Sequence, residues 1–184
     1  MNKVAIFSLA ILLVNAELIH AQTIQFKKYT NPTYKFSFDI PINWTIRYSK
    51  KQEGFICVPL TKTEKENYDD CFEGIVFRME FYKSNLDSAL LSDVGYTKTD
   101  DRYYTSDRLN DTVLAKNIKG KNWIGIYHNN ICGISCKDNG FHAAGGQCEF
   151  LYFSNNKTTI GINTNGRKFD NAILKRLISS FRFD

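Results

Sequence analysis

The sequence predicts an α+β fold, in which helices cover an antiparallel β-sheet of about six or seven strands. Three observations lead to this class. Several segments alternate apolar and polar residues with a period of two, which is typical of half-buried strands. Aromatic residues are abundant, with 14 Phe and 10 Tyr against three Pro, and flat side chains pack well on a pleated surface. The last segment carries apolar residues at helical spacing, which indicates a helix packed on the sheet.

The first two predicted strands follow one another closely. TYKFSFDIP, residues 33–41, alternates apolar residues with Lys35, Ser37 and Asp39. Pro41 has no amide hydrogen and ends this strand. NWTIRYS, residues 43–49, resumes the alternation. We therefore expect a hairpin that turns at residues 40–43.

The middle of the chain predicts further strands and a short helix. GFICVPL (54–60) and EGIVFRMEFYK (73–83) are predicted strands. LDSALLSDVG (86–95) has helical spacing, and its final Gly95 favours a helix C-terminus. Residues 96–120 are polar, and DTVLAKNI (111–118) is the one strand predicted within them.

The last third predicts three strands and the clearest helix. The strands are NWIGIYH (122–128), QCEFLYFS (147–154) and KTTIGINT (157–164). The last two flank Asn155 and Asn156, a pair that tolerates the left-handed conformation of a tight hairpin turn. In FDNAILKRLISSF, Asp170 can cap a helix whose apolar stripe is Ile173, Leu174, Leu177, Ile178 and Phe181.

The N-terminal segment has the pattern of a signal peptide, which we place at residues 1–21. Lys3 precedes an apolar run from Val4 to Val14, and cleavage is expected after Ala16 or Ala21. The run is shorter than the roughly 20 residues that a spanning helix needs. We expect residues 22–184 to form a single domain that is exported to the periplasm or the extracellular space, with no membrane span in the mature chain.

The charge pattern disfavours nucleic acid as a partner. Removing residues 1–21 removes one Lys and one Glu, so the mature chain keeps the formal net charge of +5. The basic residues are scattered among acidic and aromatic ones, whereas a nucleic-acid-binding protein concentrates them on one face or helix.

Both ends of the chain resemble the PsbP-like domain family. The opening YTNPTYKFSFDIPINWTI (29–46) is similar to the aromatic-rich start of these domains, and ISSFRF (178–183) is similar to their end. The resemblance implies an antiparallel sheet covered by helices. It also implies a binding or accessory module of the cell envelope, since such domains share no catalytic residues to carry over.

The segment CGISCKDNGFHAAGGQC (132–148) raises the question of a metal site or an active site. A zinc module would use Cys132, Cys136, His142 and Cys148, because three thiolates and an imidazole suit tetrahedral zinc. A secreted cysteine hydrolase would use Cys148 as nucleophile and His142 as base. Both compete with disulfide formation, which an oxidising compartment favours.

Disulfides are the preferred interpretation of the five cysteines. Cys57 and Cys71 flank a polar loop that a bridge would close. Cys148 would pair with Cys132 or Cys136, and we favour Cys136–Cys148. A crossed arrangement that joins Cys57 or Cys71 to the later cluster stays open.

The sequence therefore predicts a non-enzymatic module that binds a protein or an envelope component and needs no cofactor or metal. The expected contact surfaces are the loops 61–72 and 133–147, because function tends to lie on loops held by a rigid sheet. The expected contact residues are Tyr103, Tyr104, Phe141 and His142. An inhibitor or immunity-type protein is one specific version of this prediction.

Overall fold

The structure is a computed structural model that describes residues 24–50, 54–60, 75–107, 109–135, 141–164, 166 and 168–184. The side chains of 133–135 and 141–145 are not part of this description. The predicted signal peptide and loop 61–72, together with Cys71 and Cys136, lie outside the described residues. Among the described residues, no helix is both long enough and apolar enough to span a bilayer.

The described chain consists of short strands with two helical regions. The strands are β1 (Phe26–Asn31), β2 (Phe36–Pro41), β3 (Trp44–Ser49), β4 (Gly54–Pro59), β5 (Phe77–Tyr82), β6 (Thr97–Thr99), β7 (Arg102–Ser106), β8 (Thr112–Leu114), β9 (Lys116–Lys119), β10 (Ile124–Ser135), β11 (Phe141–Ser154), β12 (Thr159–Thr164) and β13 (Arg182–Phe183). The helices are α1 (Leu86–Ser88), which continues into the π-helical turn η1 (Ala89–Val94), and α2 (Asn171–Ser180).

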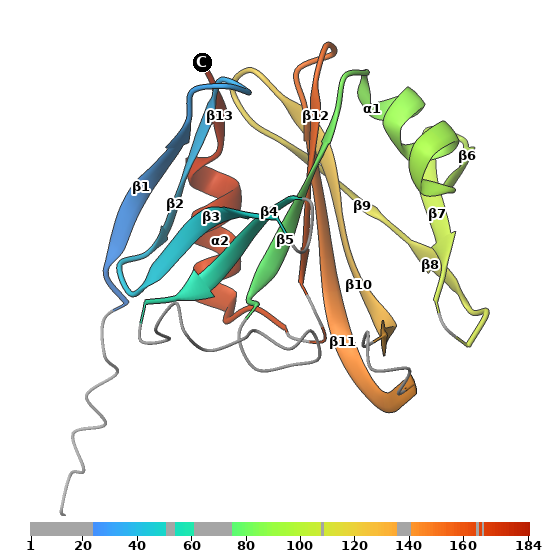
Figure 1. The fold of residues 1–184 in the computed structure, drawn as a ribbon. Helices are drawn as coiled ribbons and strands as arrows, with labels where there is room; N and C mark the ends of the chain where they lie inside the picture. Colours follow the sequence, from blue (N-terminus) through green and yellow to red (C-terminus); the bar gives the residue numbers. More distant parts are fainter. Residues whose placement is uncertain are drawn as a thin grey trace, which may run out of the picture.

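A seven-stranded antiparallel sheet forms the centre, in the order β3-β4-β5-β12-β11-β10-β9. A three-stranded sheet, β1-β2-β13, lies on one side of it together with α2 (Figure 1). A second three-stranded sheet, β6-β7-β8, lies on the other side together with α1. We call the two faces of the large sheet the α2 face and the α1 face.

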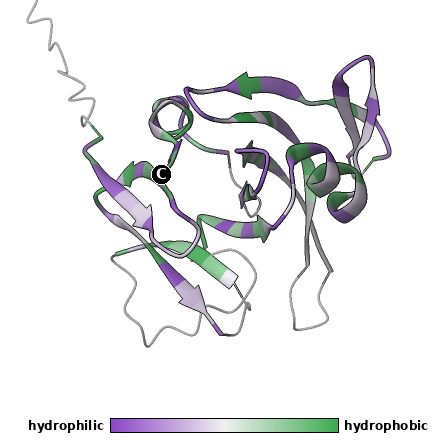
Figure 2. Ribbon diagram, turned by 90° about the horizontal axis from the view of Figure 1, so that it is seen from above, coloured by the Kyte–Doolittle hydropathy of each residue, from purple (hydrophilic) through white to green (hydrophobic). Residues whose placement is uncertain are grey.

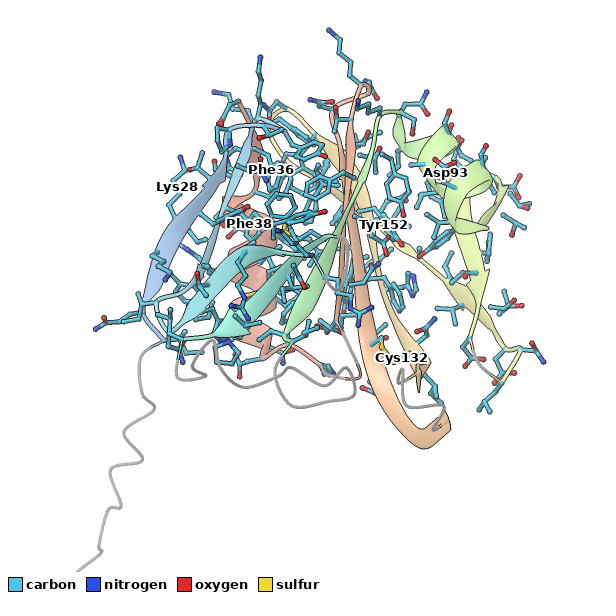
Figure 3. All side chains as sticks on the ribbon, in the orientation of Figure 1. Lys28, Phe36, Phe38, Asp93, Cys132 and Tyr152 are labelled. Atoms are coloured by element: carbon cyan, nitrogen blue, oxygen red, sulfur yellow. A yellow bond between two sulfur atoms is a disulfide. The ribbon has the colours of Figure 1, made fainter. Side chains whose placement is uncertain are left out.

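The α2 face carries the main hydrophobic core, which gathers around Phe181. This side chain is fully buried and stacks on Phe153 from the large sheet, with ring centroids 3.9 Å apart. It also stacks on Phe36 and Phe38 of β2 at 5.7 and 6.0 Å. Trp123 donates a hydrogen bond from Nε1 to the Phe181 carbonyl at 2.9 Å. The residue after α2 thus joins the helix, the small sheet and the large sheet. Figure 3 shows Phe36 and Phe38 of the small sheet among the rings of this core.

The predicted pattern of strands and the helix cap are largely confirmed. Several strands are banded green and purple in Figure 2, as expected when alternate residues face opposite sides. Asp170 accepts a hydrogen bond from the Ala172 amide at 2.7 Å and caps α2. Asn156 has φ 70° in the turn that joins β11 to β12. Gly95 has φ 88° and ends η1.

The predicted hairpin between residues 34–40 and 43–49 is wrong. The strand β2 pairs with β1 and β13, whereas β3 pairs with β4 in the large sheet. After Pro41 the chain passes from one sheet to the other, and the Ile42 amide bonds to the Gln25 carbonyl at 2.9 Å. Alternation of apolar and polar residues identifies a strand but does not indicate which strand it pairs with. The sequence pattern also did not predict β1, the strand with which β2 pairs.

The predicted glycine-rich loop 133–147 is also wrong in most of its length. Strand β10 continues to Ser135, and β11 begins at Phe141 and pairs with it. A Cβ at Gly146 would lie 2.8 Å from the Cα of Gly166, so glycine permits a close backbone approach here. Gly146 therefore serves the sheet and does not belong to a loop.

The α+β description fits only loosely, because antiparallel sheet dominates the described residues. Helix α2 has 10 residues and α1 only three. The large sheet has the seven strands that were predicted at the upper limit, but two small sheets supply much of its cover.

The central position of Phe181 yields a stability prediction. We expect Phe181→Ala to lower the free energy of unfolding by about 3–5 kcal/mol, because it leaves a cavity among packed rings. Leu109→Ala is the control, since Leu109 is 63% exposed, and we expect it to change stability by less than about 0.5 kcal/mol. Urea unfolding of both variants measures this, and equal losses would contradict the assignment of Phe181 as the core residue.

Candidate functional site

A cleft lies beside β5 at the end of β4 that begins with Gly54. Among the described residues three pairs join β4 to β5, from Phe55↔Met79 to Cys57↔Phe77, whereas β12 pairs with all six residues of β5. The outer edge of β5 beyond Met79 therefore borders a cavity of about 470 Å³. We call this cavity the edge cleft. Its lining residues are Tyr34, Gly54, Phe55, Ile56, Arg78, Met79, Glu80, Phe81 and Tyr82.

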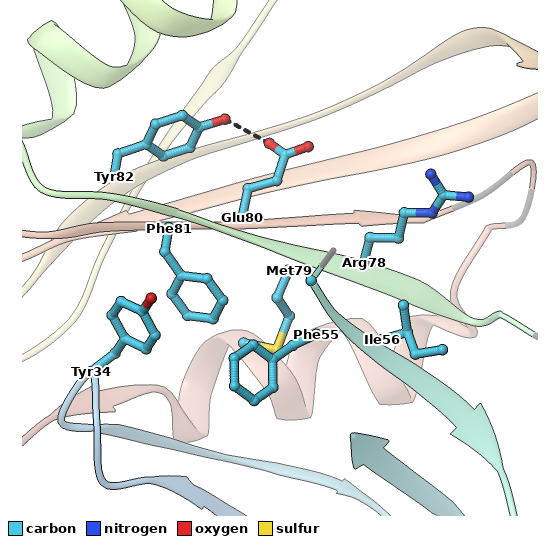
Figure 4. Close-up of a pocket in the computed structure, with 9 residues that line it drawn as sticks. Tyr34, Phe55, Ile56, Arg78, Met79, Glu80, Phe81 and Tyr82 are labelled. Carbon is cyan, nitrogen blue, oxygen red and sulfur yellow. Dashed lines mark hydrogen bonds between the residues drawn. The ribbon is translucent and has the colours of Figure 1, made fainter. Parts of the chain in front are cut away.

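The edge cleft has a polar wall and an apolar wall, because successive side chains of β5 point to opposite faces. Arg78, Glu80 and Tyr82 lie on the α1 face (Figure 4). Phe81 lies on the α2 face, where Tyr34 stacks on it with ring centroids 3.9 Å apart. Phe55 meets Phe81 edge-on at 5.4 Å. The cleft thus offers charge on one side and aromatic surface on the other.

The two charged groups of the polar wall are not neutralised by each other. The Glu80 carboxylate accepts a hydrogen bond from the Tyr82 hydroxyl at 2.6 Å. Among the described residues the buried Nε atom of Arg78 has no hydrogen-bond partner. In the same part of the chain Arg78 and Glu80 form no ion pair with each other, although both project from the same face of β5. A buried polar atom without a hydrogen bond costs free energy, so this arrangement favours a ligand that accepts a bond from Arg78 Nε.

A buried polar network continues from the polar wall across the α1 face. Arg78 lies opposite Asn163 of β12, and the Asn163 side chain lies close enough to Tyr152 to act against the rise in its pKa. The Tyr152 ring meets the Tyr96 ring edge-on with centroids 5.8 Å apart, and the Tyr96 hydroxyl shares a hydrogen bond with Nε2 of His128. The network links the edge cleft to the cover formed by α1 and β6.

Burial controls the protonation of this network. It raises the pKa of Tyr82, Tyr96 and Tyr152 well above the usual phenol value, and the nearby Glu80 charge adds to the effect. The hydroxyls therefore stay protonated. Burial also lowers the pKa of His128 to about 4, so its imidazole is neutral at pH 7.

Several atoms at the edges of the network lack partners among the described residues. They are the buried side-chain atoms Arg78 Nε, His128 Nδ1, Asn130 Oδ1 and Asn163 Oδ1. All four belong to strands β5, β12 and β10, on the α1 face of the large sheet. Such atoms are rare in native proteins and often mark sites where water or a ligand completes the bonding.

The preferred cysteine pairing is contradicted. Cys148 is bonded to Cys132, with Cα atoms 5.6 Å apart on neighbouring strands, so it does not pair with Cys136. Cys57 is a free thiol in the main core and does not pair with Cys71. The reason is the pleat: Cys57 shares its face with Phe77 and points into the core. Burial raises the pKa of this thiol well above its usual range.

The disulfide also contradicts the two competing site assignments. Cys148 cannot act as a nucleophilic thiolate while its sulfur is bonded to that of Cys132. The zinc set of Cys132, Cys136, His142 and Cys148 fails for the same reason, because two of its sulfurs are joined. No cluster that could hold a metal occurs within the described parts of the chain.

Two of the four predicted contact residues, Tyr103 and Tyr104, have described side chains. Tyr103 is only 6% exposed, and its hydroxyl donates to Asp87, so it is not an exposed anchor. Tyr104 is half-buried. The side chains of Phe141 and His142 lie outside the described residues.

Sequence reasoning missed the edge cleft, although one signal was present. EGIVFRMEFYK places Arg78 and Glu80 on one face of a strand whose other face is apolar. Two opposite charges on the same face of an internal strand are unusual enough to mark a site. The partner strands that form the cleft could not be read from that segment.

Comparison with known proteins gives only distant similarities. The sequence matches no protein-family model, and no curated protein is significantly similar to it. A crystal structure from Bacteroides thetaiotaomicron VPI-5482 covers 88% of this chain with 12% identity and a TM-score of 0.45, and the chain spans about half (49%) of that structure's length. The solution structure of cyanobacterial PsbP (CyanoP) from Synechocystis sp. PCC 6803 covers 90% of this chain, with 8% identity and a TM-score of 0.42, and 96% of that chain is matched.

The neutral His128 predicts a specific loss of stability in acid. Its pKa is about 4 in the folded protein against 6.5 in the unfolded chain, so the unfolded chain takes up a proton first as pH falls from 6.5 to 4. We expect this to lower the free energy of unfolding by about 3 kcal/mol over that window. His128→Gln should lack this contribution, which urea titrations of both proteins at pH 7 and pH 4.5 would reveal.

The comparison with the variant removes the contributions of other groups. Burial raises the pKa of Glu149, which acts in the opposite direction and is present in both proteins. Equal pH dependence of the wild type and the variant would contradict a buried neutral His128.

The cysteine assignment predicts a defined alkylation pattern. In the folded protein without reductant, we expect Cys57 to resist iodoacetamide, because it is buried, and to react once the chain is unfolded. Peptide mapping should find Cys132 and Cys148 joined. A Cys132→Ser/Cys148→Ser variant should lose about 3 kcal/mol of stability. The reason is that the bridge joins residues 16 positions apart in the sequence and restricts the unfolded chain. A Cys57-containing disulfide would contradict the assignment.

Proposed function

We propose that this protein is an exported, non-enzymatic binding module with a PsbP-like fold, and that its partner binds in the edge cleft. The observation that carries the proposal is the cleft itself. It is a half-open cavity of about 470 Å³. Arg78 and Glu80 offer opposite charges to a partner, and the rings of Tyr34, Phe55 and Phe81 offer aromatic surface. A cavity that combines apolar walls with a few polar groups is the usual form of a binding site.

The chemistry of the lining residues supports binding over catalysis. The nine described residues that line the cleft include Arg78, Glu80 and two tyrosines, and none of these nine is Ser, Cys or His. Tyr82 cannot readily act as a base, because burial and Glu80 raise its pKa well above the usual value. These groups can orient and hold a partner without supplying a nucleophile.

Export is supported by the N-terminal pattern and by the disulfide. Residues 1–21 have the composition of a signal peptide. The Cys132–Cys148 bridge suits an oxidising compartment. The sequence resemblance at residues 29–46 and 178–183 supports the PsbP-like assignment and the role as an accessory module of the envelope.

The proposal predicts that an aromatic residue of the cleft is needed to capture the partner. We expect the mature protein, incubated with an envelope extract of the producing organism, to retain a component that native mass spectrometry detects. Tyr34→Ala should weaken retention about tenfold or more, because it removes the ring stacked on Phe81. Retention should be unchanged in Tyr104→Ala, a matched tyrosine on β7.

Two results would contradict the proposal. One is equal retention by wild type and Tyr34→Ala, with circular dichroism showing that both are folded. The other is release of the component in a chemically altered form, which would indicate an enzyme.

A further inference from the structure

We infer that the edge cleft binds a small zwitterion with an apolar side chain, either a free apolar amino acid or a dipeptide. This inference rests on the proposed function and specifies its ligand. Three features of the cleft carry it: an arginine for the carboxylate, a glutamate for the ammonium group, and an aromatic wall for the side chain.

Arg78 is the group that would bind the carboxylate. It is the one cation among the described residues that line the cleft, and within the described chain its buried Nε has no hydrogen-bond partner. The guanidinium presents its donors in a planar fork that matches the two oxygens of a carboxylate. A bound carboxylate would therefore supply a hydrogen bond to Nε and a counter-charge to the guanidinium.

Glu80 is the group that would bind the ammonium. The Tyr82 hydroxyl donates to its Oε2 at 2.6 Å and holds the carboxylate in place, which leaves Oε1 for a second donor. Glu80 and Arg78 stand two residues apart on one face, so their backbones are separated by about 7 Å. A ligand with only one charge would leave the other group uncompensated in a partly enclosed site.

The aromatic wall would receive the side chain of the ligand. Tyr34, Phe55 and Phe81 lie on the opposite side of β5 from the charged pair (Figure 4). Strand β4 begins at Gly54, which has no side chain, and none of the described residues of β4 pairs with β5 beyond Met79, so a ligand can lie across this edge of β5 and touch both walls. The volume of about 470 Å³ is near the lower end of ligand pockets, which fits an amino acid or a dipeptide.

Calorimetric titration with defined probes tests the inference. The probes are L-phenylalanine, its amide (which lacks the carboxylate), its N-acetyl derivative (which lacks the ammonium) and the dipeptide Phe-Phe. We expect the wild type to bind a zwitterionic probe at least about tenfold more tightly than the amide or the N-acetyl form, because each loses one charge-assisted contact. The tighter of L-phenylalanine and Phe-Phe identifies the source of the ligand.

Matched variants assign each contact. Arg78→Gln should abolish the preference for the zwitterion over the amide, and Glu80→Gln should abolish the preference over the N-acetyl form. Arg102→Gln, an exposed arginine on β7, should bind like the wild type. Melting curves confirm that every variant is folded under the titration conditions.

The outcomes separate this inference from the proposed function. Equal affinity for L-phenylalanine and its amide, or a preference that survives Arg78→Gln, overturns the inference. Failure of all four probes, while Tyr34→Ala still abolishes retention of the envelope component, also overturns it but leaves the edge cleft as a binding site. Failure in both experiments removes the cleft as a site.

Discussion

The large sheet is covered on both faces, and this constraint governs the rest of the structure. A strand that is buried on both sides must place both of its alternating sets of side chains in a packed environment. On the α2 face the requirement is met by aromatic rings around Phe181. On the α1 face the same strands carry hydroxyl, amide and imidazole groups, which are buried and therefore need hydrogen-bond partners. The hydrogen bond between Tyr96 and His128 meets part of this requirement.

The edge cleft arises from a mismatch in strand length at the same sheet. Among the described residues β4 pairs with only half of β5, and the remainder of β5 presents both of its faces to one cavity along its outer edge. Strand edges invite association with other chains, and here Tyr34 from the turn between β1 and β2 lies beside this edge. The described residues of the polar wall, Arg78, Glu80 and Tyr82, all belong to β5. The proposed binding surface is therefore part of the sheet, in contrast to the loops that the sequence analysis favoured.

The disulfide has a structural role that fits the extension of β10 and β11. It joins these strands near the end where they project beyond the rest of the sheet, as the position of Cys132 in Figure 3 shows. Two strands that project alone from a sheet have few packing partners, and a covalent link restricts their separation. Cys57 differs from Cys132 because it points into the main core, where Phe77 and Phe153 also lie, and is shielded from oxidation by burial.

The sequence by itself determined the local features of this protein. It predicted most strands, the cap at Asp170, the turn at Asn156 and the apolar stripe of α2, because these depend on residues a few positions apart. Only the tertiary structure decided that β2 leaves β3 for another sheet, that Cys148 meets Cys132, and that Arg78, Glu80 and Tyr34 surround one cavity. Those outcomes depend on which strands become neighbours. Backbone pairing is chemically almost the same for every strand, so the choice follows from the packing of side chains that are distant in sequence.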